Sequence, residues 1–498
     1  AGSYNNPQRI DGSNTGDYEN FAPSDTAGTS TAASALGFVL NSNDVNAVQW
    51  MTSDEKGLLA GTLGSEWVIR PSSQSEALSS TNISAKRTTS YGSADIQALQ
   101  VGKSSLFVQR AGRKVRELTY FYDVDGFQAP DISILAEHIT ATGIVGLAFQ
   151  KEPQTIVWMC LNDGSLIGMT YERSIDGLKV GFHRHTVAGV SDAAGNPAEV
   201  ESVAVIPSAD GTRDEVWVAV KRYVNGATVR HIEYLNPLFD RESRQYAAVF
   251  LDASLTLNLP RAIEGVTNAS PGVVTVTTHG LVNGDKVIFQ ELTSMTELNG
   301  NSYTVTVVDA DNFSIGEDTT SYDPFVALLP GLVDGYFYKK VTTLSGLDHL
   351  EGETVSVLGD GAVQNDKTVS GGAITLDSAA GYVTVGLAYN SDVRQLRLEA
   401  GAQDGTSIGK IRRAHRVGVL LERTLGIKLG KDFDTMDRLV FREASDIAGQ
   451  ATPLYSGIRV EKVDFGYDYG NQVCIRADQP LPATILAIMP QLHTQDDA

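Results

Sequence analysis

Short apolar runs, rich in β-branched and aromatic residues, alternate along the chain with turns built from Gly, Asn and Asp. This pattern is typical of strands, and the 48 glycines supply turn positions that need a positive φ angle. Helical signals occur in two places. "DISILAEHI" (Asp131 to Ile139) begins with an aspartate N-cap and has apolar residues at helical spacing, and "DTMDRLVF" (Asp434 to Phe441) adds a turn or two. The sequence therefore predicts a mainly β protein.

The first half of the chain repeats a three-strand unit at intervals of about fifty residues. The units begin at "NAVQWM" (Asn46), "IQALQV" (Ile96), "GIVGLAF" (Gly143) and "VESVAVI" (Val200). Repeats of this length, with tryptophans in the strands, are typical of propeller blades. We therefore predict a partial or complete β-propeller over residues 1–245, with blades incomplete at the N-terminal end. The alternative is a run of antiparallel hairpins in a sandwich.

A separate small module follows at residues 263–328. It contains three predicted strands joined by Asn-Gly and Asp-Asn turns. Its landmarks "GLVNGDKV", "ELNG" and "DADNFSI" resemble the small β-barrel of ubiquitin-activating enzymes, the first catalytic-cysteine half-domain. The module contains no cysteine, so the resemblance implies a fold and no thioester chemistry.

The strand-like segments on the two sides of this module, "LDASLTL" (Leu251 to Leu257) and residues 341–363, would pair if the module were cut out. We therefore predict that the module is inserted into a surface loop, where an insertion costs little. Residues 246–262 and 329–400 are predicted to form a β platform. Residues 401–498 are predicted to form a C-terminal, sandwich-like β region that completes either the platform or the propeller.

Composition limits the classes of function. Sixty acidic and 39 basic residues give a net charge of −21, which argues against a protein that reads nucleic-acid sequence through a basic face. It does not argue against a surface past which DNA slides. Cys160 and Cys474 lie in apolar runs and are predicted to be buried free thiols, which excludes a disulfide scaffold. No apolar run approaches the ~20 residues that cross a bilayer, and no signal peptide is evident. The chain begins without Met, which is typical of a processed chain or of a fragment with further residues upstream.

Signals for catalysis or metal binding are weak, and no cofactor is predicted. His183 and His185 share one face of a strand and could hold a metal, but they have no third ligand at a characteristic spacing. "SGLDHLEGETV", with Asp348, His349, Glu351 and Glu353, is a polar turn or an acid/base group. Asp123 and Asp125 could flank a glycosidic bond, or form an ordinary loop. "GDGAV" at Gly359 predicts a tight turn rather than a phosphate loop.

The densest basic cluster lies in "LFVQRAGRKVRELTYF" (Leu106 to Phe121), which predicts a strand, a turn and a second strand. Arg110, Arg113, Lys114 and Arg116 gather around the tip of this hairpin. A second basic segment, "GKIRRAHRVG", carries Arg412 and Arg413. We interpret these six residues as charges of a subunit interface or a channel. Solvated arginines and direct phosphate contacts are the alternatives.

Motifs spread over nearly the whole chain outside the module resemble the tail nozzle family of short-tailed bacteriophages, also called tail tubular protein B. They are "RIDGSNTGDYENF", "SNDVNAVQWM", "GLLAGTLGSEWVI", "TTSYGSADIQALQVGKSSLFVQRAGRKVREL", "PDISILAEHI", "YVTVGLAYNSDV" and "VCIRADQPLPATILAIMP". The resemblance implies a structural virion protein at the distal end of the tail, assembled in the host cytoplasm. It also implies a six-copy ring that contacts the tail adaptor protein and the tail fibres or spikes.

In that role the ring is a conduit and gate for DNA ejection, and DNA passes through the lumen without sequence-specific binding. The alternatives are a tail protein that binds a host receptor or glycan, with the inserted module touching the host surface, and an enzyme that degrades cell-surface polysaccharide.

Overall fold

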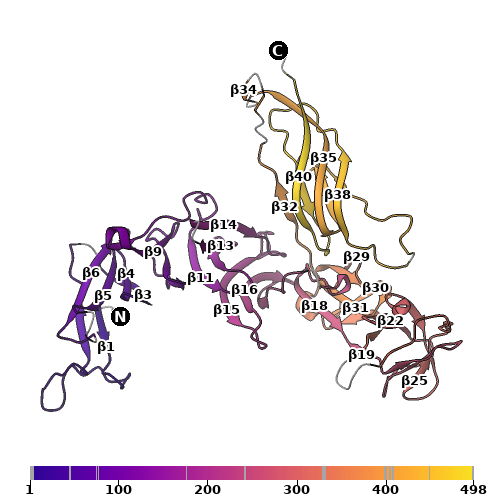
Figure 1. Cartoon of the computed structure of the whole chain (residues 1–498), viewed down its shortest axis with the longest axis horizontal. Coiled ribbons are helices and arrows are strands. Elements are labelled where there is room, and N and C mark those ends of the chain that lie inside the picture. The colour runs from indigo at the N-terminus through magenta and orange to yellow at the C-terminus, as the bar shows by residue number, and fades with distance from the viewer. Residues whose placement is uncertain are drawn as a thin grey trace. The chain divides into compact units, whose positions relative to one another are not determined.

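The structure, a computed structural model, describes residues 5–43, 46–73, 76, 78–174, 177–240, 243–327, 333–397, 401–402, 405–406, 409–447 and 449–495. The chain divides into two compact units, Ala1–Arg222 with Arg230–Leu235, and Tyr223–Val229 with Asn236–Ala498. Within the described ranges the elements are antiparallel strands and four short 3-10 helices, and no α-helix occurs (Figure 1). The mainly β prediction is confirmed. None of these helices is long and apolar enough to span a membrane.

The first unit contains one small two-stranded sheet and a series of larger antiparallel sheets, in which consecutive strands are neighbours. The small sheet is β1 (Arg9–Gly12) with β2 (Leu36–Val39). The first two larger sheets are β3 (Val48–Asp54), β4 (Gly57–Thr62), β5 (Glu66–Pro71), β6 (Ile83–Thr89), and β7 (Leu99–Val101), β8 (Ser104–Val108), β9 (Val115–Phe121), β10 (Gly126–Gln128), with the 3-10 helix η1 (Tyr122–Val124) between β9 and β10. The next two are β11 (Ile144–Gln150), β12 (Ile156–Leu161), β13 (Leu166–Ser174), β14 (Gly177–His185), and β15 (Glu199–Pro207), β16 (Asp214–Val224), β17 (Ala227–Tyr234). All twelve predicted repeat strands are therefore present.

Each of these sheets packs face to face on the next through a shared core. Trp50 of the first sheet lies 5.6 Å, between ring centroids, from Phe107 of the second. The neighbouring residue Leu106 points to the opposite face and joins the core shared with Val157 of the third sheet. This alternation is the two-residue period of a strand that is buried on both faces. The third sheet packs in turn on the fourth, around Trp158 and Val218.

The helix predicted at Asp131 to Ile139 is absent, and a series of turns takes its place. Ile132 N–H donates to Val115 O at 3.1 Å, and Val115 N–H donates to Ser133 Oγ at 3.0 Å. The segment therefore bonds to the edge of β9 instead of to itself, so the helical prediction was wrong. The second predicted helix, Asp434 to Phe441, was also wrong, because the strand β37 (Met436–Arg438) pairs there with β36 (Ile427–Gly430).

The inserted module forms two open four-stranded sheets around one core that includes Phe289, Phe313 and Phe337. The sequence predicted a small barrel, but these strands are only two to five residues long, too short for a ladder to run round the core. One sheet is β19 (Pro260–Ala262), β26 (Tyr336–Lys339), β22 (Lys286–Gln290), β23 (Ser302–Thr304); the other is β20 (Gly265–Val266), β21 (Val273–Thr275), β25 (Asn312–Ser314), β24 (Thr306–Val307), with the helix η3 (Thr296–Leu298).

The platform that carries the module has one four-stranded and one two-stranded sheet. They are β18 (Asp252–Asn258), β31 (Tyr382–Leu387), β28 (Thr354–Gly359), β29 (Ala362–Thr368), and β27 (Val341–Ser345) with β30 (Ala373–Ala380); the helices are η2 (Gln245–Ala247) and η4 (Asp348–Leu350). The segments flanking the module were predicted to pair directly. Instead β31 lies between β18 and β28 and pairs with both of these strands.

The C-terminal region is a two-layer sandwich. One layer is β38 (Tyr455–Lys462), β35 (Ile411–Thr424), β40 (Thr484–Gln495); the other is β32 (Ser391–Arg394), β39 (Cys474–Ala477), β36, β37, and β33 (Gly401–Ala402) pairs with β34 (Gly405–Thr406). Val419 of β35 and Ile475 of β39 belong to the core between the layers, and Leu358 of the platform joins the same core. The C-terminal region therefore packs on the platform within the second unit.

Candidate functional site

The tip of the β8–β9 hairpin carries the basic cluster that the sequence singled out. The hairpin prediction is confirmed, and the turn is closed by Gln109 N–H donating to Lys114 O at 2.9 Å. Arg110 and Arg113 are exposed at this tip. Neither guanidinium has an ion-pair partner among the residues that the structure describes.

The other two cations of the tip are held by the protein itself. Lys114 Nζ lies 2.7 Å from Glu137 Oε1 and 3.0 Å from Asp131 Oδ2, and the bond to Glu137 followed by that to Asp131 raises the pKa of Lys114. The guanidinium of Arg116 lies 3.5 Å from the centroid of the Tyr91 ring. These two side chains therefore stabilise the fold and leave Arg110 and Arg113 as the outward charges.

A hollow of about 260 Å³ lies beside the tip and is lined by Gln109, Ala111, Arg113, Lys114 and Glu137. Glu137 neutralises Lys114, so Arg113 is the one cation that this hollow offers to a ligand. Phosphate grooves on proteins combine several cations. The hairpin tip is consequently a surface on which Arg110 and Arg113 are the two exposed cations without an ion-pair partner in the described part of the chain.

Arg412 and Arg413 lie on β35 in the second unit. Arg412 is 2 % exposed, and its main chain is paired with Asp468 through N–H···O bonds of 3.1 and 2.9 Å. Its charge is therefore not presented on the surface of the chain. Arg413 is partly exposed, and its guanidinium donates to Asp464 Oδ1 at 2.9 Å. The sequence could not separate these two neighbours, because a β-bulge between Ala414 and Arg416 shifts the alternation of faces.

His183 and His185, the candidate metal ligands, both lie on β14. Nδ1 of His183 is 2.7 Å from Nε2 of His185, so the two rings bond to each other. Both rings pack against the Trp158 indole, with centroid distances of 6.1 and 4.8 Å. In the described part of the chain, no group of three His, Cys, Asp or Glu residues could hold a metal ion. Burial lowers the pKa of His183, and burial lowers that of His185 to about 4.

Two of the acidic candidates for acid/base chemistry, Glu351 and Asp125, have structural partners. Glu351 accepts the backbone N–H groups of Gly371 and Gly372 at 3.0 and 2.8 Å and thereby fastens two turns together. Asp125 has a left-handed backbone conformation, with φ 46°, and accepts the Tyr120 hydroxyl. Carboxylates engaged in turns of this kind are typical of ordinary loops.

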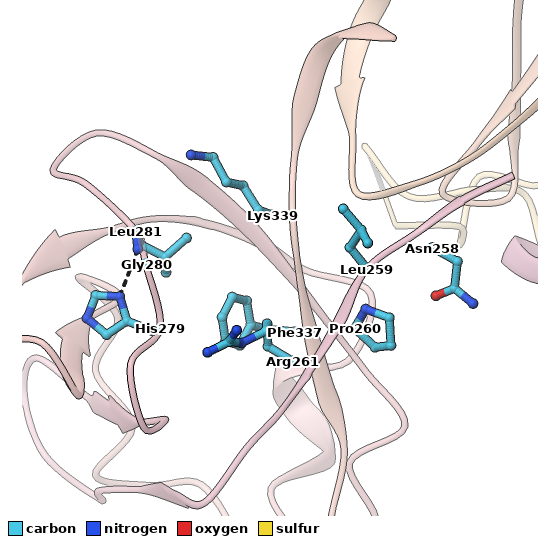
Figure 2. Close-up of a pocket in the computed structure, with 9 residues that line it drawn as sticks. All are labelled: Asn258, Leu259, Pro260, Arg261, His279, Gly280, Leu281, Phe337 and Lys339. Carbon is cyan, nitrogen blue, oxygen red and sulfur yellow. Dashed lines mark hydrogen bonds between the residues drawn. The ribbon is translucent and has the colours of Figure 1, made fainter. Parts of the chain in front are cut away.

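A second hollow, which no sequence motif indicated, lies where the module joins the platform (Figure 2). It has a volume of about 370 Å³ and is lined by Asn258, Leu259, Pro260, Arg261, His279, Gly280, Leu281, Phe337 and Lys339. These residues come from three separate stretches of the chain, so no local motif could indicate the site. The aromatic ring of Phe337 and the side chains of Leu259 and Leu281 give the hollow an apolar wall.

Three polar side chains around this second hollow, those of His279, Arg261 and Lys339, have partners within the protein. Leu281 N–H donates to His279 Nδ1 at 3.0 Å, so Nε2 of this ring carries the proton and donates to Asp309 O at 2.9 Å. Arg261 donates to Thr277 O at 3.0 Å, and Lys339 Nζ lies 2.7 Å from Asp285 Oδ2. The hollow is thus apolar with a rim of fixed charges. Such a site suits an apolar side chain or the face of a sugar better than a free anion.

Comparison with known proteins gives a match for the inserted module. The family described as "Ubiquitin-activating enzyme E1 FCCH domain" matches residues 269–333. Ubiquitin-like modifier-activating enzyme 6 of Mus musculus is 42% identical over 67 residues, and that of Homo sapiens is 40% identical over 67 residues. The aligned part is 13% of this chain and 6% of each enzyme. The predicted resemblance of the module is confirmed.

Among solved structures, the extracellular domain of the putative one component system BT4673 from B. thetaiotaomicron aligns with 73% of this chain and 55% of its own chain. The identity is 13% and the TM-score is 0.23, a value that carries no argument about the fold. Cys160 and Cys474 both lie outside the matched module. The matched residues 269–333 therefore contain no cysteine.

Proposed function

We propose that this chain is the structural subunit of the distal nozzle of a short phage tail, a conduit and gate for DNA ejection into the host. One observation carries the proposal: four consecutive antiparallel sheets of similar size pack face to face through shared cores. We interpret these sheets as propeller blades, which the sequence motifs of the tail nozzle family lead us to expect. Six copies would form the ring.

The charge distribution supports a conduit. The net charge of −21 repels DNA and limits its trapping in transit. Most of the basic side chains singled out by the sequence are occupied by the protein: Lys114 and Arg413 form ion pairs, and Arg412 is buried. Arg110 and Arg113 remain outward, and we assign them to a contact with a neighbouring subunit or with the lumen.

The proposal places the chain in the virion, at the distal end of the tail, after assembly in the host cytoplasm. Its neighbours would be the tail adaptor protein and the tail fibres or spikes, and DNA would pass without sequence-specific binding. Cys160 and Cys474 are buried free thiols, which fits a reducing compartment. Burial raises the pKa of Cys160 to about 12, so its unreactive thiol form is favoured.

The test is the position of the chain in intact particles. Antibody fragments raised against this polypeptide should bind purified tails at the distal end, and image averaging should show six copies around the axis. Purified infectious particles that lack the polypeptide would exclude the proposal. A monomer in free solution is compatible with it, because tail rings can close on their neighbours.

The second candidate is a tail protein that binds a host receptor or glycan. The observation that favours it is the apolar hollow of about 370 Å³ at the base of the inserted module. Removal of the module from the phage gene should abolish adsorption if this candidate is correct, while particle yield stays unchanged. Leu281→Asp, which places a charge in the hollow, should have the same effect on adsorption. Normal adsorption of both variants would exclude it.

A further inference from the structure

The outer face of the sheet β38-β35-β40 is apolar and exposed in the part of the chain that the structure describes. Val417, Val419 and Leu421 of the central strand β35 point into the sandwich core. The residues between them therefore point outward, following the two-residue period of a strand. This face lies entirely within the second unit, and Figure 1 shows its three strands side by side.

Two adjacent rows of residues cross this face. In one row Leu420 pairs with Ile458 of β38 and Ala487 of β40; in the next, Gly418 pairs with Val460 and Met489. Leu486 lies beside the first row, at a bulge. Ile458, Val460, Leu486 and Met489 are between 41% and 57% exposed. Contiguous apolar surface of this kind marks an interaction site.

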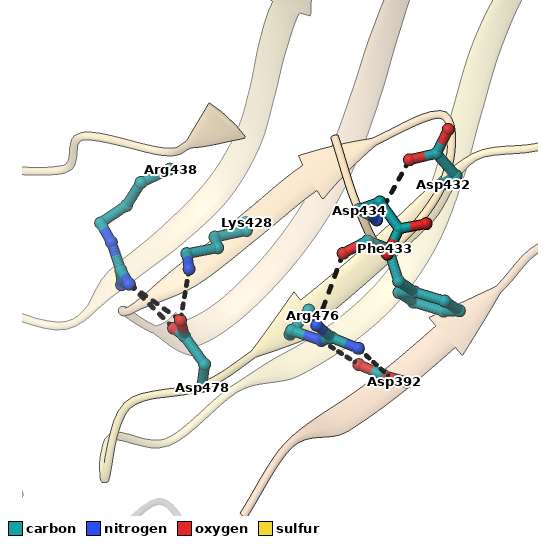
Figure 3. A network of polar contacts seen from close by, with 8 residues as sticks. All are labelled: Asp392, Lys428, Asp432, Phe433, Asp434, Arg438, Arg476 and Asp478. Carbon is teal, nitrogen blue, oxygen red and sulfur yellow. Dashed lines mark hydrogen bonds and ion pairs between the residues drawn. The ribbon is translucent and has the colours of Figure 1, made fainter. Parts of the chain in front are cut away.

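The other layer of the same sandwich provides an internal comparison (Figure 3). The row that crosses its outer face is Asp392, Arg476, Lys428 and Arg438. Arg476 binds Asp392 through two bonds of 2.7 Å, and Asp478 accepts from Lys428 at 2.6 Å. One outer face is thus covered by ion pairs that suit water, whereas the other presents hydrocarbon.

We propose that the outer face of β38-β35-β40 binds a second copy of itself. The two rows differ along the middle strand: Leu420 carries a side chain in one row, whereas in the next Gly418 carries none and the Met489 side chain lies against it. A two-fold axis that lies in the plane of the interface, parallel to the two rows and midway between them, places the Leu420 of each copy over the Gly418 of the other. Such a contact uses one patch on both copies and closes at two.

The charged residues at the two ends of this outer face fit the same arrangement. The row beyond Gly418 holds Arg416 and Lys462, and the alternation places Glu422 on this face at the opposite end. The two-fold rotation brings the cationic end of one copy over the acidic end of the other. The contact is separate from the head-to-tail contacts that a ring requires, so it stands whether or not the nozzle proposal is correct.

The size of the face sets the strength of the contact. The outer face has three strands that are about 5 Å apart and about 20 Å long, so its projected area is roughly 300 Å². Stable interfaces bury about 800 Å² on each partner. We therefore expect a weak dimer, with a dissociation constant on the order of 100 µM.

The experiment is sedimentation velocity of the full chain at protein concentrations from about 5 to about 500 µM, a range that brackets the expected dissociation constant. The wild-type chain should pass from monomer to dimer over this range. Ile458→Lys should weaken the association at least tenfold. Ile232→Lys is the matched control, because Ile232 is an isoleucine of the first unit's strand β17 that is 69% exposed. Its association should match that of the wild type.

An exchange of charges tests the two-fold arrangement. Arg416→Glu alone brings two acidic ends together and should weaken the dimer at least tenfold; Arg416→Glu combined with Glu422→Arg places opposite charges over each other again and should restore the dimer. Circular dichroism checks that each variant is folded. A wild-type chain that stays monomeric at every concentration overturns the proposal, and so does equal weakening by Ile458→Lys and Ile232→Lys. A failure of the folded double variant to associate excludes the two-fold packing.

Discussion

His183 and His185 share a hydrogen bond of 2.7 Å between Nδ1 of the first ring and Nε2 of the second, on the face of β14 that meets Trp158. This bond holds one proton between two neutral rings. The rings lie in the packed region of the third sheet, where burial disfavours the charged form of either. Their protonation state is therefore tied to folding.

The pair predicts a loss of stability in mild acid. Both histidines have a folded-state pKa below the ordinary value of 6.5, about 4 for His185, so the unfolded chain binds their protons first as the pH falls. Their contribution is fully present above pH 6.5 and is lost between about 6.5 and 4. We expect a loss on the order of 1–3 kcal/mol in the free energy of unfolding. Urea unfolding at several pH values measures it, and His185→Phe should flatten the profile. An unchanged profile in that variant would contradict the assignment.

We predict that the position of the His183 ring requires a glycine at position 168. A Cβ atom at position 168 would lie 2.0 Å from His183 Cε1, so the ring must move when a side chain is added. Gly168→Ala should lower the free energy of unfolding by about 1–3 kcal/mol. Gly181→Ala is the control in the neighbouring strand of the same sheet, because a Cβ there meets nothing within 4 Å. Equal effects of the two substitutions on thermal unfolding would show that the contact with His183 is not the cause.

The basic residues of the hairpin tip should behave differently from one another. Arg116→Ala removes the contact with the Tyr91 ring and the bond of 2.9 Å to Gln109, and should cost about 1–2 kcal/mol of stability. Arg113→Ala, at an exposed position, should change stability by less than about 0.5 kcal/mol. Denaturant unfolding of the two variants compares them directly. A larger loss for Arg113→Ala would mean that its guanidinium has a structural partner.

The inserted module should fold by itself. Its core of buried residues, with Phe289, Phe313 and Phe337 at 0 to 1% exposure, is contained within residues 260–339. A fragment spanning residues 258–341 should give a dispersed amide NMR spectrum and a cooperative thermal transition. Phe337→Ala in the same fragment should unfold it, because deletion of a buried phenylalanine costs about 3–5 kcal/mol. A wild-type fragment without a cooperative transition would mean that the platform is needed for folding.

The strands of the first unit could be predicted because each carries its own pattern. Continuous burial on β8 and β12 follows from short apolar runs such as "SLFVQR" and "TIVWMCL", and sheets packed on both faces keep these strands buried. The module could be predicted for the same reason, together with its Asn-Gly turns. The fourth strand of the second sheet, β10, has only three residues and is too short to leave such a signal.

Other features depend on contacts between distant segments. The turns at Asp131 replaced a helix because β9 offered backbone partners, which the local sequence cannot show. The pairing of β18 with β31 joins residues more than a hundred positions apart. The burial of Arg412 and the hollow beside His279 likewise arise only when separate stretches pack together.

The module is attached to the platform by two chain crossings that lie side by side, since Pro260 of β19 pairs with Tyr338 of β26. Tyr338 also packs against Tyr246 and Tyr382, with ring centroids 6.2 and 5.9 Å apart. A domain joined by one chain crossing can rotate about it, whereas two adjacent crossings and three packed tyrosine rings resist rotation. A pull on the module would therefore be transmitted as tension into β18 and β27, and from there into the platform sheets, instead of being absorbed by a loose tether.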